Sequence, residues 1–141
     1  MLITEFNFGS TDRGPFWGGV TQLAKEEDRG TAYANFLKQA LNEPSVVGVH
    51  WFQYLDQPVT GRLLDGENGH FGLVGITDLP FQGFVDSVRK SNLAAIDQLA
   101  KDAEKAAAEA NKPSHGAEGG READAGKGPG KGAGGHSGKG H

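Results

Sequence analysis

Carboxylate and aromatic side chains gather at two points of the chain where strands are predicted to end. Glu5 lies near the end of an alternating segment, and Trp51, Gln53 and Tyr54 lie near the end of a more apolar one. Aromatic rings stack on sugar rings, and carboxylates stabilise the positive charge that develops on a sugar when a glycosidic bond breaks. This combination favours carbohydrate chemistry. On pattern alone, a second interpretation of Glu5, as an exposed or helix-capping carboxylate, is equally open.

Two predicted strands would position these side chains. Residues 2–8 alternate between apolar and polar types, which puts Ile3, Glu5 and Asn7 on one face of a strand. Residues 46–54 form a nearly continuous apolar and aromatic run, which is typical of a strand buried on both faces.

Two helices are predicted from apolar residues at helical spacing. The first covers residues 26–41, and the second runs from a cap at Thr77 or Asp78, with Pro80 in its first turn, to about Asn111. The apolar face of the first consists of Tyr33, Phe36, Leu37, Ala40 and Leu41. The stripe of the second consists of Val85, Val88, Asn92, Ile96, Leu99 and Ala103.

The order strand, helix, strand, helix predicts an α/β fold with a parallel sheet. Two strands rarely make a stable sheet alone, and the 141 residues are well short of the roughly 250 of a (β/α)₈ barrel. The two longest loops, residues 9–19 and 55–75, both follow strands, on the face where barrel enzymes place their active sites. We therefore expect a βαβα portion of a larger barrel.

Several blocks of sequence carry a more specific signal. They are Ile3–Gly9, Asp12–Gly14, Gly48–Tyr54, Asp56–Arg62, Asp65–Asn68 and Gly72–Pro80. Together they resemble family 50 of the glycoside hydrolases, the β-agarases, in register over residues 1 to about 92. The resemblance implies the C-terminal part of a retaining (β/α)₈ barrel, in which residues 2–8 are strand seven and residues 46–54 are strand eight.

The resemblance also implies roles for individual residues. Glu5 would be the nucleophile that cleaves β-1,4 bonds of agarose, and Trp51 would be the aromatic platform beneath the sugar. The expected substrate-binding residues are Asn7, Trp17, His50, Trp51, Gln53, Arg62, Asp65 and Glu67. A structural role within a buried strand competes with sugar contact for His50, and a salt bridge to Asp65 competes with a contact to a sugar hydroxyl for Arg62. No metal or other cofactor is expected.

One departure bears on activity. A retaining glycosidase needs a second carboxyl group about 5–5.5 Å from the nucleophile. In the family that this chain resembles, the acid/base follows strand four, which this chain does not contain. We therefore expect the isolated chain to be inactive, with a non-catalytic or vestigial carbohydrate-binding protein as the alternative. The expected partners are agarose or related galactan oligosaccharides, and either the missing N-terminal barrel portion or a second copy of the chain.

Composition limits the remaining possibilities. The net charge of −4 argues against nucleic acid, the absence of cysteine excludes disulfides, and no apolar run reaches the roughly 20 residues that span a membrane. The expected segments are a partial barrel (1–92), a helical extension (93–112) and a disordered Gly-, Lys- and His-rich tail (113–141). No secretory signal is recognisable, the location is left open, and full-length relatives are expected to be secreted or periplasmic.

Overall fold

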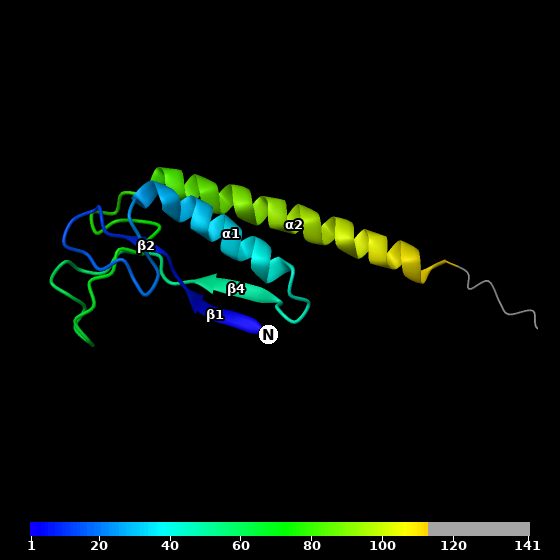
Figure 1. Cartoon of the computed structure of the whole chain (residues 1–141), viewed down its shortest axis with the longest axis horizontal. Helices are drawn as coiled ribbons and strands as arrows, with labels where there is room; N and C mark the ends of the chain where they lie inside the picture. The colour runs from blue at the N-terminus through cyan, green and yellow to red at the C-terminus, as the bar shows by residue number, and fades with distance from the viewer. Residues whose placement is uncertain (113–141) are drawn as a thin grey trace, which may run out of the picture. The chain divides into compact units, whose positions relative to one another are not determined.

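Two parallel strands and two helices form the frame of residues 1–112, the part of the chain that the computed structural model describes. Their order is β1 (Leu2–Phe6), α1 (Arg29–Leu41), β4 (Gly48–Trp51) and α2 (Gln82–Ala110). β1 pairs with β4 in parallel, and α1 connects them (Figure 1). The α/β class and the βαβα order are therefore confirmed. The predicted disordered tail lies outside the described residues.

Three small elements lie between β1 and α1. β2 (Gly9–Ser10) pairs in parallel with β3 (Gln22–Leu23), and a 3₁₀ turn (Glu26–Asp28) leads directly into α1. The sequence did not predict this second strand pair. It folds the long loop after β1 back on itself, so the residues of that loop stay near the end of the β1–β4 sheet.

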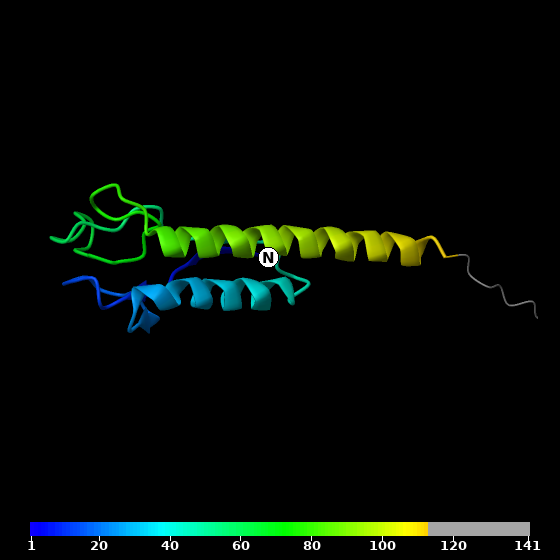
Figure 2. The ribbon, with the colours of Figure 1, turned by 90° about the horizontal axis from the view of Figure 1, so that it is seen from above.

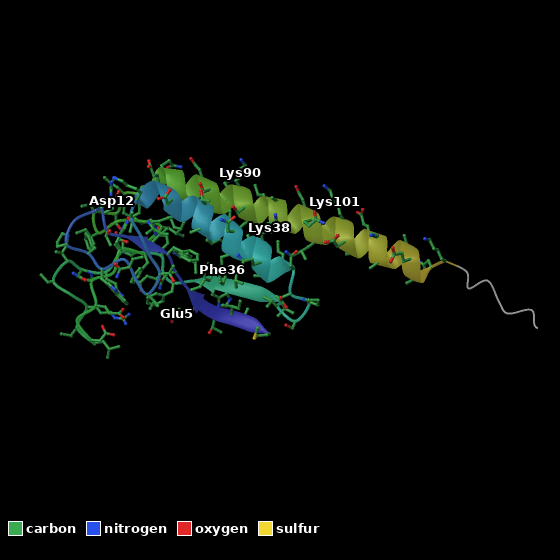
Figure 3. The ribbon with its side chains drawn as sticks, in the orientation of Figure 1. Glu5, Asp12, Phe36, Lys38, Lys90 and Lys101 are labelled. Carbon is green, nitrogen blue, oxygen red and sulfur yellow. The ribbon has the colours of Figure 1, made fainter. Side chains whose placement is uncertain are left out.

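An irregularity in β1 sets the direction of Glu5. The pairing register shifts between Ile3 and Phe6. As a result Ile3 lines a cleft with Phe36 of α1, and Phe6 also stacks on Phe36 with ring centroids 4.1 Å apart. The predicted alternation placed Ile3 on the same face as Glu5, and it is wrong at this point. A β-bulge adds one residue to β1 between Ile3 and Phe6, so both of these side chains face α1. Glu5 points from the face of β1 turned away from α1 (Figure 3).

An aromatic core fills the space between the strand pair and the helices. Trp51 of β4 packs against Phe6 at 5.2 Å, Tyr33 at 5.7 Å and Phe84 at 5.1 Å between ring centroids. Tyr33 and Phe84 are 5 % and 2 % exposed. Aromatic side chains bury large apolar areas, so this cluster supplies much of the hydrophobic stabilisation that holds α1 and α2 on the sheet.

β4 differs from its predicted form in length and burial. It covers Gly48–Trp51 rather than residues 46–54, and His50 within it is exposed. The strand is not buried on both faces, because among residues 1–112 it pairs only with β1 and the helices cover one face of that pair (Figure 1). The alternative of a structural His50 within a strand buried on both faces therefore does not fit this strand.

Helix α2 also begins differently from the prediction. Thr77 and Asp78 do not cap it; Asp78 has a φ of 60° within a turn closed by the Gly75 N–H and the Leu79 carbonyl, 2.9 Å apart. The helix starts at Gln82 after Phe81, which makes no side-chain cap. The predicted C-terminal end near Asn111 is confirmed, since Asn111 follows the last helical residue.

The face that α2 turns towards α1 is offset from the predicted apolar stripe. Its buried residues are Phe84 and Ala95, whereas Ile96 and Leu99 are 61 % and 54 % exposed. The two helices lie side by side (Figure 2). The predicted stripe instead borders an apolar groove beside β4, which is lined by Val49, Ile96 and Leu99 among others. No helix within residues 1–112 is long and apolar enough to cross a membrane.

Candidate active site

A cavity of about 220 Å³ opens beyond the carboxyl end of β1, on the face opposite the helices. Its walls come from β1 and from the loops that follow both parallel strands. The lining residues are Glu5, Asn7, Trp17, Val20, Phe52, Arg62, Glu67 and Phe71. Ligand sites of parallel α/β sheets lie at the carboxyl ends of the strands, because the loops there are free to vary without disturbing the core.

Hydrogen bonds from one backbone N–H and one side chain join the two loops that form these walls. The His70 N–H donates to the Trp17 carbonyl at 2.9 Å, and the Asn68 side chain donates to the Pro15 carbonyl at 2.9 Å. The joined loops hold the Trp17 ring edge-on to Phe71, with 5.8 Å between ring centroids. Trp17 remains 37 % exposed, so one part of its ring is available to a ligand.

Gly19 permits this close approach at the pocket wall. Its φ is 85°, and a Cβ at this position would lie 2.6 Å from the Asn7 side-chain oxygen and 3.0 Å from the Phe71 ring. Both the backbone conformation and the space therefore require glycine.

A clamp of charged groups organises the loop after β4. The Nε and Nη2 atoms of Arg62 donate to the two Asp65 carboxylate oxygens at 2.7 and 2.6 Å, and Nη2 also contacts a Glu67 oxygen at 3.0 Å. Gln57 donates to the same Glu67 oxygen at 2.9 Å, which ties the clamp to a buried part of the loop. The paired donors of Arg62 match the carboxylate of Asp65, an arrangement that fixes orientation as well as distance.

The contacts of this clamp shift the pKa values of Asp65 and Arg62. Hydrogen bonds from the Arg62 side chain, and then from the Glu67 backbone N–H, lower the pKa of Asp65 to about 2. The hydrogen bond to Asp65 raises the pKa of Arg62, and the negative charges of Asp65, Glu67 and Glu5 act in the same direction. Arg62 and Asp65 are therefore both charged at neutral pH.

The lowered pKa of Asp65 predicts the pH range in which its contacts with Arg62 weaken. A carboxyl group with a lowered folded-state pKa stabilises the structure above its ordinary value, here 3.8, and that stabilisation disappears as the pH falls towards about 2. We expect the Asp65 carboxyl resonance, followed by carbon-13 NMR, to titrate near pH 2. In Arg62→Met the midpoint should return towards the ordinary value. An unchanged midpoint in that variant would show that Arg62 does not hold Asp65.

A second, buried network lies beneath the loops. His70 Nδ1 lies 2.7 Å from an Asp56 oxygen, and the other Asp56 oxygen accepts the Gly72 N–H at 2.6 Å. Arg29 donates to the Phe8 carbonyl at 2.9 Å and to the Gly72 carbonyl at 2.8 Å. Arg29 and His70 are both fully buried and Asp56 is 4 % exposed. The network therefore ties the start of α1 to both loops of the pocket.

The charges of this network balance one another. Burial lowers the pKa of Arg29 to about 10, so the guanidinium stays protonated at neutral pH. It lies 4.1 Å from the centroid of the Phe84 ring and faces the His70 Nε2 at 3.5 Å. With Arg29 as a donor towards Nε2, His70 carries its proton on Nδ1 and donates to Asp56. These contacts assign Asp56 and His70 to architecture rather than to a substrate or a metal.

The structure brings together five of the predicted site residues. Glu5, Asn7, Trp17, Arg62 and Glu67 all line the cavity. Their proximity follows from the parallel pairing of β1 and β4 and from the joined loops, which bring residues more than 60 positions apart in sequence to one place.

The other predicted site residues lie elsewhere or act indirectly. The Trp51 ring belongs to the aromatic core and its indole N–H donates to the Phe71 carbonyl at 3.0 Å, so the expectation of a sugar platform at Trp51 is corrected. His50 is exposed outside the cavity lining. Gln53 donates to the Leu55 carbonyl at 2.6 Å, and Asp65 contacts Arg62 from outside the lining.

Phe52 is one of three cavity residues that sequence reasoning missed; the others are Val20 and Phe71. Phe52 follows the core residue Trp51, so it faces the opposite side of the sheet, towards the cavity with Glu5. Its ring also lies 5.9 Å below the Arg62 guanidinium. Strand alternation carried the necessary signal: assigning Trp51 to the helix-facing core puts Phe52 on the other face.

Comparison with known proteins bears on what this cavity does. β-Agarase B of Vibrio sp. (strain JT0107) is 47 % identical over 91 residues, which are 64 % of this chain and 10 % of that protein. β-Agarase A of the same strain is 40 % identical over 92 residues, 65 % of this chain and 9 % of that protein. The chain resembles β-agarases. No protein-family model matches it.

Solved structures show the same resemblance to agarases. An exo-β-agarase superposes with a TM-score of 0.65 at 40 % identity, over 68 % of this chain and 13 % of that one. The crystal structure of an agarase, AgWH50C, gives 0.64 at 38 % identity, over 67 % of this chain and 15 % of that one. This chain spans about a tenth of the length of the curated agarases that it matches.

Proposed function

We propose that the chain supplies the last two βα units of a retaining (β/α)₈ glycoside hydrolase that cleaves β-1,4 bonds of agarose, with Glu5 as the nucleophile. One observation carries this proposal: Glu5 lines a cavity at the carboxyl end of a parallel strand pair, together with Asn7, Trp17, Arg62 and Glu67. The resemblance to agarases in sequence and structure supports agarose as the substrate.

In this mechanism the Glu5 carboxylate attacks the anomeric carbon of the sugar, and a covalent glycosyl-enzyme forms as the glycosidic bond breaks. Water then releases the sugar with its original configuration. The bulge in β1 favours the role of Glu5, because it turns this side chain away from α1 and leaves its carboxylate exposed at the cavity. Trp17 and Phe52 would contact the apolar faces of the sugar.

The acid/base that protonates the leaving oxygen would come from outside this chain. Glu67 is the second carboxylate of the cavity, but Arg62 and Gln57 both engage one of its oxygens. These contacts hold the Glu67 side chain in the wall of the cavity, where it orients Arg62 rather than reaching the leaving oxygen of a bound sugar. We therefore propose that the isolated chain does not hydrolyse agarose.

Unpaired surfaces support the existence of a complementary portion. Among residues 1–112, β1 and β4 each pair with one strand of their sheet, so each leaves one edge free. The apolar groove beside β4, a cavity of about 630 Å³, borders the exposed side chains of Ile96 and Leu99. A further βα unit of the barrel would pair with the strand edge and cover this groove.

Complementation tests the proposal directly. The full 141-residue chain alone should release no reducing sugar from agarose. Mixing it with the portion of Vibrio β-agarase B that precedes the matched region should restore hydrolysis, because the barrel and the acid/base are then complete. Activity of the chain alone, or an inactive complex of the two parts, would contradict the proposal.

A non-catalytic carbohydrate-binding protein is the second candidate. The engagement of Glu67 by Arg62 favours it, since the cavity of this chain then has one carboxylate free for chemistry among residues 1–112. Under this alternative the chain binds galactan oligosaccharides through Trp17 and Phe52, and the complemented mixture stays inactive although the two parts associate.

A further inference from the structure

One guanidinium nitrogen of Arg62 takes no part in the contacts with Asp65 and Glu67. Nε and Nη2 are engaged by Asp65 and Glu67, whereas Nη1 has no hydrogen-bond partner among residues 1–112. Arg62 lines the cavity with Glu5, and its side chain is 31 % exposed. A guanidinium donor that is oriented by its other nitrogens and open to a cavity is suited to bind an acceptor there.

Glu5 complements this donor. Its carboxylate also has no hydrogen-bond partner within the described chain, and its charge reaches Arg62, where it adds to the rise in the Arg62 pKa. A hydroxyl group can accept a hydrogen bond from a guanidinium and donate one to a carboxylate. A sugar hydroxyl between the two would therefore satisfy both groups at once.

We propose that Arg62 determines specificity in the Glu5 cavity: its Nη1 donates to one hydroxyl of the galactose unit bound against Glu5, and Asp65 and Glu67 act through Arg62 as positioning residues. This assignment rests on the proposed placement of a sugar at Glu5. It changes the roles of Asp65 and Glu67, which the sequence suggested as direct substrate ligands.

The structure supports an indirect role for the carboxylates of Asp65 and Glu67. Both Asp65 oxygens accept hydrogen bonds from Arg62, and one of them also accepts the Glu67 N–H at 3.1 Å. The engaged oxygen of Glu67 accepts from Gln57, whose own side-chain oxygen accepts the Gly69 N–H. This series of contacts runs from the Arg62 guanidinium to a buried backbone segment. It restricts the guanidinium before a ligand arrives, so less conformational freedom is lost on binding.

Binding by the full 141-residue chain tests the assignment without requiring catalysis. The probes are methyl β-galactoside and its three analogues that lack the 2-, 4- or 6-hydroxyl, titrated while the Trp17 indole N–H is followed by NMR. One analogue should bind at least about tenfold more weakly than the parent, because a hydrogen bond to a charged donor is lost. In Arg62→Met the parent should weaken by about the same factor, and the difference between it and that analogue should vanish.

Two further variants separate the donor from the clamp. Asp65→Asn keeps Arg62 but no longer fixes the orientation of its guanidinium. The affinity difference between methyl β-galactoside and the rejected analogue should therefore fall part of the way towards that of Arg62→Met. Arg89→Met removes an exposed arginine on α2, outside the cavity, and should bind all four probes as the unmodified chain does. The near-ultraviolet circular dichroism of the aromatic side chains checks that each variant keeps its fold.

Several outcomes would overturn the assignment. These are an Arg62→Met chain that still rejects the same analogue, an unmodified chain that treats all three analogues alike, or a chain that does not bind methyl β-galactoside. The proposed hydrolysis is judged separately, by complementation. If discrimination depends on Arg62 while the complemented mixture is inactive, the catalytic proposal fails and the role of Arg62 stands; in the reverse case only Arg62 loses its role.

Discussion

Replacing Glu5 with glutamine should reduce the agarose-hydrolysing activity of the complemented mixture by at least about 10⁴-fold, the scale of loss when a covalent nucleophile is removed. Glutamine has nearly the same shape as glutamate but carries no negative charge, so it cannot attack the anomeric carbon. Glu5 lines the cavity on an exposed face of β1, and the substitution removes no hydrogen bond within residues 1–112. The loss should therefore appear in kcat while the fold and the association of the two parts stay intact.

A smaller side chain at the same position separates a nucleophile from a merely binding carboxylate. Glu5→Ala leaves space beside the anomeric carbon, and azide should partly restore the reaction by attacking in place of the carboxylate. The product should then be a glycosyl azide of inverted configuration, which proton NMR distinguishes from the retained sugar.

The matched control is Glu43→Gln, an exposed carboxylate after α1 and outside the cavity. It should leave the activity unchanged. If Glu5→Gln retains more than about a tenth of the activity, Glu5 is not the nucleophile, because no ordinary substrate contact is as indispensable as the group that forms the covalent bond.

Replacing Asp56 with asparagine should lower the free energy of unfolding by about 2–4 kcal/mol, because a buried charged acceptor of two hydrogen bonds is lost and one donor is left without a partner. Asp56 is 4 % exposed and accepts from His70 and from the Gly72 backbone. Its negative charge also supports the buried guanidinium of Arg29, whose pKa burial has already lowered to about 10. Asparagine removes one of the two negative charges near that cation, leaving Glu26 at 3.6 Å, and it offers a single acceptor oxygen.

The expected decrease is large compared with the stability of a domain of this size, which is of order 5–15 kcal/mol. Urea unfolding followed by tryptophan fluorescence measures it, because the Trp51 ring lies in the aromatic core and Trp17 lies in a loop that the network holds. Asp97→Asn, an exposed change on α2, is the control and should leave the unfolding midpoint where it is. Equal midpoints for the two variants would show that the Asp56 network does not contribute to stability.

The same network explains why the cavity keeps its shape although loops form it. Arg29 holds the Phe8 carbonyl, three residues beyond Glu5, and the Gly72 carbonyl beside the cavity residue Phe71. The first residue of α1 thus anchors the ends of both loops. The Asp56→Asn change should therefore loosen the two loops before it disturbs the stacked aromatic core between α1 and β1.

Local patterns in the sequence determined the order and type of the main elements. The helical spacing of Tyr33, Phe36 and Ala40 predicted α1, and the parallel pairing of β1 with β4 follows from the connection through that helix. These predictions succeeded because they depend on periodicity, which neighbouring residues express directly. The resemblance to agarases rested on blocks of residues in register and also required no structure.

Tertiary contacts decided the features that periodicity cannot express. The bulge that places Ile3 and Phe6 on the same side of β1 arises from packing against Phe36, and the start of α2 depends on a turn at Asp78. The assignment of Trp51 to the core and of Phe52 to the cavity depends on which face of β4 the helices cover. His50 is exposed because β4 has one neighbouring strand within the described chain.

The sequence by itself therefore determined a βαβα unit with Glu5 at the end of its first strand and a resemblance to β-agarases. The resemblance also predicted Arg62 and Glu67 at the substrate site. The tertiary structure alone decided that Phe52 lines the cavity of Glu5 and that Asp65, Asp56 and His70 hold its walls from outside the lining. The reason is physical: strand and helix periods act over a few residues, whereas these side chains meet through loops whose path depends on hydrogen bonds between distant segments.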